Sequence, residues 1–317
     1  MLVLVTGATG FLGRQVVREL LARHHQVRCL VHTPGRERIF SDRSLQIHYG
    51  SVTDLDALGA ACQGVEAVIH LAAIIQQKAA ATFDEINRRG TANIVAVCRE
   101  LGGLKHFILV SAIGATSNPS FRFTHSKWQG EQEVINGGLP YTILRPSIIF
   151  GEGDAFLNSL AALIRVCPLV PVPGRGRNRF QPIAAADVAR CLALTLDRDE
   201  LKGKTVEIGG PDQPSYNEIL GIVARTMGRR RSRIHLPIWM MRPNVALMEK
   251  LLPRPPVTVE QLRLATNRNV TEPESVQQTF GFTPRPLEGN IDFVNSVRFR
   301  DGLSILSGFM PKHIRDH

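Results

Sequence analysis

The sequence predicts an α/β fold built on a doubly wound parallel sheet, and three observations support this prediction. The chain begins with an apolar run over residues 2–5, which is typical of a strand buried on both faces of a parallel sheet. A glycine-rich turn over residues 6–13 follows, and apolar side chains then recur at helical spacing as far as residue 21. Short apolar runs and amphipathic segments alternate over about the first 150 residues, which is typical of parallel strands joined by crossover helices.

Three glycines of the first turn have the pattern G-x-x-G-x-x-G, which suits a bound dinucleotide. Gly7 permits the tight turn, Gly10 lets the backbone approach a pyrophosphate, and Gly13 lets the helix pack closely on the strand. Unpaired N–H groups at the start of the helix then bind the phosphates. We therefore predict a Rossmann-type nucleotide cradle. Its expected members are Thr6, Gly7, Thr9, Gly10, Phe11, Leu12 and Gly13.

The later apolar runs complete the predicted sheet. We expect further strands over residues 26–32, 45–50, 65–71, 105–111 and 141–145. Ligands of such sheets bind outside the carboxyl ends of the strands, so residues at those ends should contact the cofactor. These residues are His32, Leu71, Ala72, Ala73, Ser111 and Pro146. Asp54 follows the third strand and is expected to hydrogen-bond the adenine, to cap the helix that begins at Leu55, or to do both.

The end of the second predicted strand indicates which dinucleotide binds. An NAD-selective site has an acidic residue there, which hydrogen-bonds the ribose 2′-hydroxyl, whereas this chain has His32 and Thr33. Arginines lie near this corner in the sequence, and guanidinium pairs bidentately with phosphate. They are Arg14, Arg28, Arg36 and Arg38. We therefore expect NADP(H) rather than NAD(H), with His32 and Arg36 at the site; the alternative is that these arginines are solvated loop residues.

The alternation of strands and helices ends near Gly151, so we expect a smaller C-terminal α/β subdomain. The predicted NAD(P)-binding domain spans residues 1–150, and residues 184–200 return to it. Residues 151–183 and 201–317 then form the smaller subdomain, which binds a substrate or a partner. Within it, residues 236–252 carry a Met-rich apolar stripe, which indicates either a core helix or an exposed face for a membrane or a partner.

Composition limits the compartment and the partners. The chain of 317 residues has no run of about 18 apolar residues, which a membrane span needs. Because its first residues already form a predicted strand, we expect no signal peptide. The 5 cysteines include no C-x-x-C pair, so we expect buried thiols in the reducing cytoplasm, and no metal site.

The net charge of +10 has several explanations. Nucleic acid is not an expected partner, because aromatic residues make up only 6% of the chain and no nucleic-acid-binding motif accompanies the basic residues. An anionic cofactor, an anionic membrane surface and plain solubility remain as alternatives.

Together the motifs resemble the short-chain dehydrogenase/reductase superfamily, in its extended and atypical branch, over residues 1–295. The markers are Thr6–Gly13, Gly50 with Asp54, His70–Ala73, Asn87 with Gly90 and Thr91, Ser111, Ser126–Lys127 and Leu144–Ser147. The chain also resembles a narrower group, which includes the NAD(P)H-binding accessory subunit of respiratory complex I and its bacterial relatives. The residues that carry this resemblance are Ser126–Trp128, Arg179–Pro182, Gly209–Pro211 and Asn269–Thr271. The resemblance implies that Asn87, Ser111 and Lys127 contact the cofactor.

The resemblance also implies a catalytic set, and one member is missing. In this superfamily a Tyr four residues before a Lys carries the substrate proton, a Ser orients the substrate, and the Lys binds the ribose and lowers the pKa of the Tyr. Ser111 and Lys127 are present, but Phe123 occupies the Tyr position. A phenyl ring has no exchangeable proton. His125 lies off the Phe123 and Lys127 face of the helix and is a poor replacement.

Three functions follow from these observations. The leading hypothesis is an NADP(H)-binding, oxidoreductase-like protein with weakened or absent catalysis. By analogy with its relatives, it would be an accessory or assembly component of a membrane electron-transfer complex, cytoplasmic and peripheral to the membrane. The alternative is an active NADP(H)-dependent reductase or epimerase on a small or quinone-like substrate. A regulator whose partner affinity depends on NADPH versus NADP⁺ shares the same features.

Overall fold

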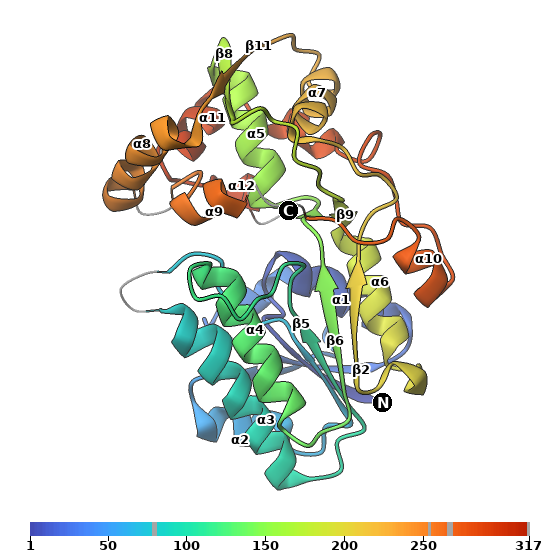
Figure 1. Cartoon of the computed structure of the whole chain (residues 1–317). Helices are drawn as coiled ribbons and strands as arrows, with labels where there is room; N and C mark the ends of the chain where they lie inside the picture. The colour runs from blue at the N-terminus through green and yellow to red at the C-terminus, as the bar shows by residue number, and fades with distance from the viewer. Residues whose placement is uncertain (78–80, 253–254, 265–268, 316–317) are drawn as a thin grey trace. The chain divides into compact units, whose positions relative to one another are not determined.

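The computed structural model of the chain describes residues 1–77, 81–252, 255–264 and 269–315 (Figure 1). The chain divides into two compact units. Unit 1 comprises residues 1–146 and 185–208, and unit 2 comprises residues 147–184 and 209–317. Each unit has a hydrophobic core of its own.

A seven-stranded parallel sheet with the strand order β10-β6-β5-β4-β1-β2-β3 forms the centre of unit 1. The strands are β1 (Leu2–Thr6), β2 (Gln26–Val31), β3 (Gln46–Tyr49), β4 (Ala67–His70), β5 (His106–Val110), β6 (Tyr141–Pro146) and β10 (Lys204–Ile208). The chain moves outward from β1 in one direction through β2 and β3, and in the other through β4, β5 and β6. The ends of β1 and β4 therefore flank the point at which such sheets bind ligands. The Rossmann-type α/β fold predicted from the sequence is confirmed.

Helices cover both faces of this sheet (Figure 1). On one face α1 packs against α6, and on the other α3 packs against α2 and α4. Their bounds are α1 (Phe11–Ala22), α2 (Leu55–Cys62), α3 (Gly90–Leu101), α4 (Arg122–Ile135) and α6 (Ala185–Thr195). Short helical segments are η1 (Arg36–Ile39), the π-helical turn η2 (Asp84–Arg89), which leads directly into α3, and η3 (Asp199–Leu201). Both faces of the sheet are thus shielded from water, as its apolar strands require.

A buried ion pair joins α4 to the sheet. Both carboxylate oxygens of Glu131 accept hydrogen bonds from Arg145 of β6, at 2.8 and 2.6 Å, and the Glu131 side chain is only 1% exposed. Glu207 of β10 lies 3.6 Å from the same guanidinium. The two-pronged pairing fixes α4 against β6 in one position.

Strand β10 corrects the expected domain boundary. The sequence predicts that residues 201–317 lie in the smaller subdomain, but β10 pairs in parallel with β6, with Lys204 opposite Thr142. Residues 147–150, expected in the first domain, lie in unit 2. A short apolar run predicts a strand, whereas its neighbour in the sheet depends on long-range packing.

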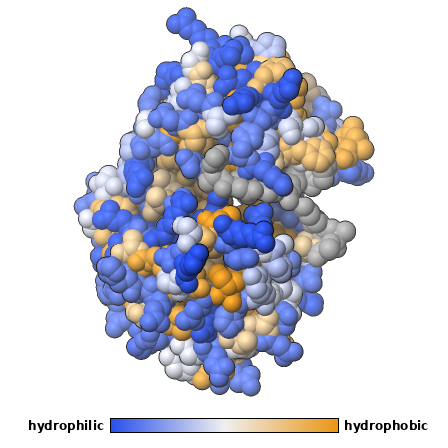
Figure 2. Space-filling view, turned by 180° about the vertical axis from the view of Figure 1, so that it is seen from behind, coloured by the Kyte–Doolittle hydropathy of each residue, from blue (hydrophilic) through white to orange (hydrophobic). Residues whose placement is uncertain are grey.

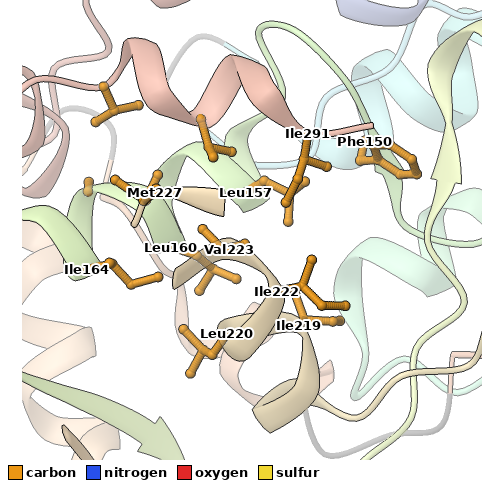
Figure 3. Packing of buried hydrophobic residues seen from close by; sticks show 14 of the residues in the cluster. Phe150, Leu157, Leu160, Ile164, Ile219, Leu220, Ile222, Val223, Met227 and Ile291 are labelled. Carbon is orange, nitrogen blue, oxygen red and sulfur yellow. The ribbon is translucent and has the colours of Figure 1, made fainter. Parts of the chain in front are cut away.

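Unit 2 is built around α5 (Ala155–Val166) and α7 (Tyr216–Thr226). Figure 3 shows their buried apolar side chains together, among them Leu157 and Leu160 of α5 with Val223 of α7. Two parallel pairs of strands complete it, β8 (Leu169–Pro173) with β11 (Ser232–Leu236) and β7 (Ile149–Phe150) with β9 (Ile183–Ala184). The remaining elements are α8 (Ile238–Leu251), α9 (Val259–Leu264), α10 (Ser275–Phe280), η4 (Asp292–Ser296), α11 (Phe299–Leu306) and α12 (Lys312–Arg315).

The Met-rich segment forms α8, and several of its large apolar side chains are exposed. Trp239 is 73% exposed, Leu247 is 55% exposed and Leu251 is 71% exposed, whereas Val245 is the buried residue of this helix. Apolar side chains are visible where α8 lies, at the right-hand edge of Figure 2. The core-helix alternative is therefore wrong for this segment, whereas the use of the exposed face by a membrane or a partner stays a prediction. Within the described ranges, no helix has the length and apolar character needed to cross a membrane.

Candidate functional site

The first turn places glycines where side chains do not fit. Gly7 has a φ of +68°, and a Cβ on it would lie 3.0 Å from the backbone nitrogen of Ala72. A Cβ on Gly13 would overlap the carbonyl oxygen of Gly7. The first backbone bond of α1 runs from Arg14 to Gly10, so within the described part of the chain the N–H groups of residues 11–13 have no partner inside the helix. This is the geometry of a phosphate cradle.

A chain of hydrogen bonds through buried His70 fixes the end of β1 beside the cradle. The Thr91 hydroxyl donates to the Asn87 carbonyl oxygen (2.7 Å), so it accepts from Nε2 of His70 (3.2 Å). Nδ1 of His70 then accepts from the Thr6 hydroxyl (2.8 Å). Burial lowers the pKa of His70 to about 3, which keeps the ring neutral and able to donate at one nitrogen and accept at the other.

The Thr6 hydroxyl also determines the path of the chain after β4. It accepts the backbone N–H groups of Leu71 and Ala72, each at 3.2 Å. Thr6 is fully buried, so these bonds and the one to His70 use its hydroxyl completely. Ala73, the next small residue along this segment, is exposed. The structure thus brings the predicted residues at the ends of β1 and β4 together, with Thr6 in a positioning role.

Asn87 of η2 binds the loop after β4 at a second point, Ile74. Its amide oxygen accepts the N–H of Ile74 (2.8 Å), and its amide nitrogen donates to the Ile74 carbonyl (3.0 Å) and to the Ser126 hydroxyl (2.9 Å). The Ser126 hydroxyl donates in turn to the Phe123 carbonyl oxygen (2.7 Å). Asn87, predicted to contact the cofactor, therefore joins the loop after β4 to α4. Sequence reasoning missed the supporting roles of His70, Thr91 and Ser126, although these residues belong to the quoted motifs.

Lys127 of α4 bonds to the carboxyl end of β5, one residue before Ser111. The Lys127 ammonium donates to the carbonyl oxygen of Val110 (2.6 Å), the residue before Ser111. Both side chains are buried, with exposed fractions of 5% for Ser111 and 8% for Lys127. Burial lowers the pKa of Lys127 to about 8. Pro146, another predicted residue, ends β6 nearby in the sheet, and its carbonyl oxygen accepts the Ile113 N–H (3.0 Å).

The hydrogen bonding of this pair is incomplete. Among the described residues, the Ser111 hydroxyl has no hydrogen-bond partner. The Lys127 ammonium has three N–H donors, and the Val110 carbonyl accepts one of them. Buried polar groups are nearly always satisfied, so a polar ligand fits this place.

The position that would supply a proton is apolar. The Phe123 ring lies against the buried ring of Phe83, with centroids 5.9 Å apart. His125 does not replace it, because its ring stacks on Trp128 at 5.7 Å and its Nδ1 lies 3.2 Å from the Thr116 carbonyl oxygen. No side chain with a titrating proton therefore occupies the Tyr position of the superfamily.

The corner after β2 contains His32 and Arg36, and their contact with the cofactor stays a prediction. His32 is exposed, with Nδ1 3.2 Å from the Thr33 hydroxyl, and Arg36 begins η1. Arg28, one of the arginines near this corner in the sequence, donates from its guanidinium to the carbonyl oxygens of Ala61 (2.8 Å) and Gln63 (2.7 Å) and thus supports the end of α2.

Asp54 caps α2. Its carboxylate accepts the Ala57 N–H at 3.1 Å, so the capping alternative is confirmed. The side chain is exposed, and its predicted bond to adenine stays a prediction.

The sequence profile of the NAD dependent epimerase/dehydratase family matches residues 3–209, which include the cradle, Ser111, Lys127 and β10. The chain belongs to this family. The resemblance inferred from the motifs is thereby confirmed, and nicotinamide dinucleotide binding is the property that the family name and the cradle share.

Similar proteins differ in what their names state. Subunit 9 of the NADH dehydrogenase [ubiquinone] 1 alpha subcomplex, from mitochondria of Arabidopsis thaliana, is 28% identical over 316 residues, 94% of this chain and 78% of that protein. A ceramide reductase from Caulobacter vibrioides is 30% identical over 239 residues, 74% of this chain and 73% of that protein. The relatives thus include both a respiratory-complex subunit and a reductase.

Solved structures share the fold. A nucleoside-diphosphate-sugar epimerase from Staphylococcus aureus has a TM-score of 0.73 at 18% identity and covers 93% of this chain and 100% of its own. A Thermus thermophilus UDP-glucose 4-epimerase, solved as a complex with NAD, has a TM-score of 0.68 at 21% identity and covers 95% of this chain and 99% of its own.

The cradle generates a first prediction. We expect Gly13→Ala to lower the free energy of unfolding by about 1–3 kcal/mol, because the added methyl group forces α1 away from the turn, and to abolish dinucleotide binding. Gly59→Ala is the matched control, since Gly59 also lies in a helix and its Cβ would meet no atom within 4 Å. Denaturant unfolding with and without NADPH measures both effects. Equal behaviour of the two variants would contradict the cradle.

Lys127 generates a second prediction. Its pKa is about 8 in the folded chain and 10.5 in its ordinary state, so between these values the unfolded chain holds more protons. The contribution of Lys127 to stability therefore rises with pH across this window, and Lys127→Met should remove that part of the rise. The free energy of unfolding near pH 7 should stay equal or increase, because a buried charge is lost.

The same variant separates binding from stability. NADPH affinity should fall at least about tenfold in Lys127→Met, because a charge-assisted hydrogen bond is lost. Lys105→Met, at the other end of β5 and exposed, should leave the affinity unchanged. Unchanged NADPH affinity in Lys127→Met, measured by titration calorimetry, would remove Lys127 from the site.

Proposed function

We propose that this chain binds NADP(H) in unit 1 as a largely structural dinucleotide and has weakened or absent hydride-transfer activity. We further propose that it acts as an accessory or assembly component of a membrane electron-transfer complex, peripheral to the membrane. The observation that carries the proposal lies beside Lys127. The buried Ser111 hydroxyl has no hydrogen-bond partner there among the described residues, while the proton-donor position four residues before Lys127 holds Phe123 packed on Phe83.

Residues of unit 1 fit each part of the dinucleotide. The open N–H groups of α1 suit the pyrophosphate, Asp54 suits the adenine, and Ser111 with Lys127 suits the ribose and nicotinamide end. The absence of an acidic residue at the end of β2, together with Arg36 nearby, supports the 2′-phosphate of NADP(H). When bound, the nicotinamide ring supplies a transferable hydride.

Weak catalysis follows from the missing proton donor. General acid–base help contributes about 10²–10⁴-fold to the rate of such reactions. Phe123 offers none, and His125 is engaged with Thr116 and Trp128. A tightly bound dinucleotide still stabilises the fold, because a ligand that binds only the folded chain shifts the unfolding equilibrium by mass action.

The partner role is supported by a relative and by a surface. The Arabidopsis relative is named as a subunit of a mitochondrial NADH dehydrogenase. In this chain, Met240, Leu247 and Leu251 recur on one face of α8 and are 44%, 55% and 71% exposed. Such a face suits an apolar partner surface.

A second candidate function is an active NADP(H)-dependent reductase. The named ceramide reductase among the relatives favours it, as do the retained Ser111 and Lys127. In that case water must supply the proton that Phe123 does not.

The cofactor preference is tested by comparing dissociation constants. We expect NADPH to bind more tightly than NADH, and Arg36→Gln to weaken NADPH binding about tenfold because a guanidinium–phosphate pair is lost. NADH affinity of the same variant is the internal control and should not change. Equal or tighter binding of NADH by the unaltered chain would refute the preference.

The catalytic claim is tested by Phe123→Tyr. The unaltered chain should oxidise NADPH slowly with a panel of carbonyl and quinone substrates, and the variant should be faster by about 10²-fold or more. Phe121→Tyr adds the same hydroxyl just before α4 and serves as the control. Turnover of the unaltered chain near 10 per second, about the median for enzymes, would establish the reductase instead.

The partner claim is tested by co-purification from detergent-solubilised membranes of cells that express the tagged chain at native level. The Leu247→Ser/Leu251→Ser variant should recover at least about fivefold less of its complex, because apolar contact area is lost. Leu101→Ser, which changes a leucine of unit 1 that is 48% exposed, is the control. A chain that remains monomeric and unaccompanied would contradict the accessory role.

A further inference from the structure

A surface pocket of about 590 Å³ in unit 2 is lined by four arginines. Arg165 lies in the last turn of α5, Arg229 and Arg231 precede β11, and Arg298 precedes α11. We refer to it as the four-arginine pocket. Its volume lies within the range of about 300–1,000 Å³ that small-molecule sites occupy. All of its lining residues belong to unit 2, so it is separate from the dinucleotide cradle of unit 1.

Two of these arginines are held in place by backbone carbonyl groups. Nε of Arg165 donates to the Val297 carbonyl oxygen (2.9 Å), and Nε of Arg231 donates to the Ile164 carbonyl oxygen (2.8 Å). These bonds link the end of α5 to the segments on either side of it, and cations at a helix C-terminus are favourable in any case. Arg165 and Arg231 therefore have a structural role in unit 2, and these bonds fix their positions.

The guanidinium groups of Arg229 and Arg298 have no such structural role. Both are exposed, and in the described part of the chain neither guanidinium forms a hydrogen bond or an ion pair. The nearby Asp301 carboxylate accepts the backbone N–H of Arg298 (3.0 Å) and lies 3.3 Å from Nε2 of His313.

The charged side chains that line the pocket are all positive. No carboxylate is among its described lining residues. Burial and the repulsion of Arg229 and Arg231 lower the pKa of Arg165. Four like charges around one hollow repel one another, so a bound anion is favoured there.

One side of the pocket is apolar and open to solvent. Phe299 lines it and is 54% exposed, and Leu303, one turn further along α11, is 48% exposed. The two residues share a helix face. Leu169, which follows the lining residue Pro168, is 46% exposed. A free phosphate needs no apolar rim, whereas a phospholipid presents a phosphate next to its acyl chains.

We propose that the four-arginine pocket binds a phosphate group, and that an anionic phospholipid headgroup supplies it while the acyl chains contact Phe299 and Leu303. The bidentate geometry of guanidinium suits phosphate oxygens. The pocket lies within unit 2, so the site does not depend on dinucleotide binding, and its failure would leave the proposed function of unit 1 unaffected.

Vesicle co-sedimentation of the full chain tests the lipid. Vesicles of phosphatidylcholine with phosphatidylglycerol should bind the chain, and pure phosphatidylcholine vesicles should bind it far less. Arg229→Gln/Arg298→Gln should lower the partition coefficient about tenfold or more. Arg230→Gln/Arg300→Gln removes the same charge from neighbouring exposed residues outside the pocket and should change it less than about threefold. An equal loss in both double variants would show general surface charge and overturn the proposal.

Calorimetry with inorganic pyrophosphate tests the source of the phosphate. Saturable binding that Arg229→Gln/Arg298→Gln abolishes supports the phosphate site. Phe299→Ser/Leu303→Ser should retain this binding and lose vesicle binding, which would identify the lipid. Pyrophosphate binding without any vesicle binding would overturn the lipid assignment and leave a soluble phosphorylated ligand. Binding of neither probe by the unaltered chain would overturn the pocket as a phosphate site.

Discussion

A neutral, fully buried histidine holds the candidate site together. His70 accepts a hydrogen bond from Thr6 of β1 and donates one to Thr91 of α3, which requires a neutral ring, and burial keeps the ring neutral by lowering its pKa to about 3. The same Thr6 hydroxyl accepts hydrogen bonds from the backbone N–H groups of Leu71 and Ala72, directly after β4. Protonation of His70 would place two donors against Thr6 and Thr91 and leave a charge in the core. The cradle, the loop after β4 and the start of α3 all depend on this chain of bonds.

Much of unit 1 could be predicted because its signals are local. The apolar run of β1 and the glycine spacing after it predict strand, cradle and helix directly, and the structure shows why Gly7 and Gly13 are required. Contacts between segments that are far apart in the sequence could not be predicted in this way. The pairing of β10 with β6, the contact of Arg28 with the end of α2 and the bonds of His70 depend on which segments become neighbours. The exposure of α8 belongs here too, since an apolar stripe on a helix is equally consistent with a core.

The two units carry different chemistry. Unit 1 has buried, closely paired polar groups, and among the described residues the Ser111 hydroxyl, near Lys127, has no hydrogen-bond partner. Unit 2 has exposed apolar side chains on α8 and a pocket lined by four arginines. The first arrangement suits a small, tightly held polar ligand, whereas the second suits large surfaces and anions. These two arrangements are compatible with a dinucleotide that stays bound in unit 1 and with a surface of unit 2 that contacts a complex or a membrane. Phe123 is the residue that distinguishes this proposed function from that of an active reductase.

The identity of the ligand that remains after gentle purification tests the central claim most directly. Mass spectrometry of the released ligand, with absorbance at the reduced nicotinamide band, reports which dinucleotide is bound and in which redox state. The account predicts NADP(H) in near-stoichiometric amount, with reduced cofactor that persists in the complex. A chain that carries no dinucleotide, and whose melting temperature does not rise on addition of NADPH, would contradict it.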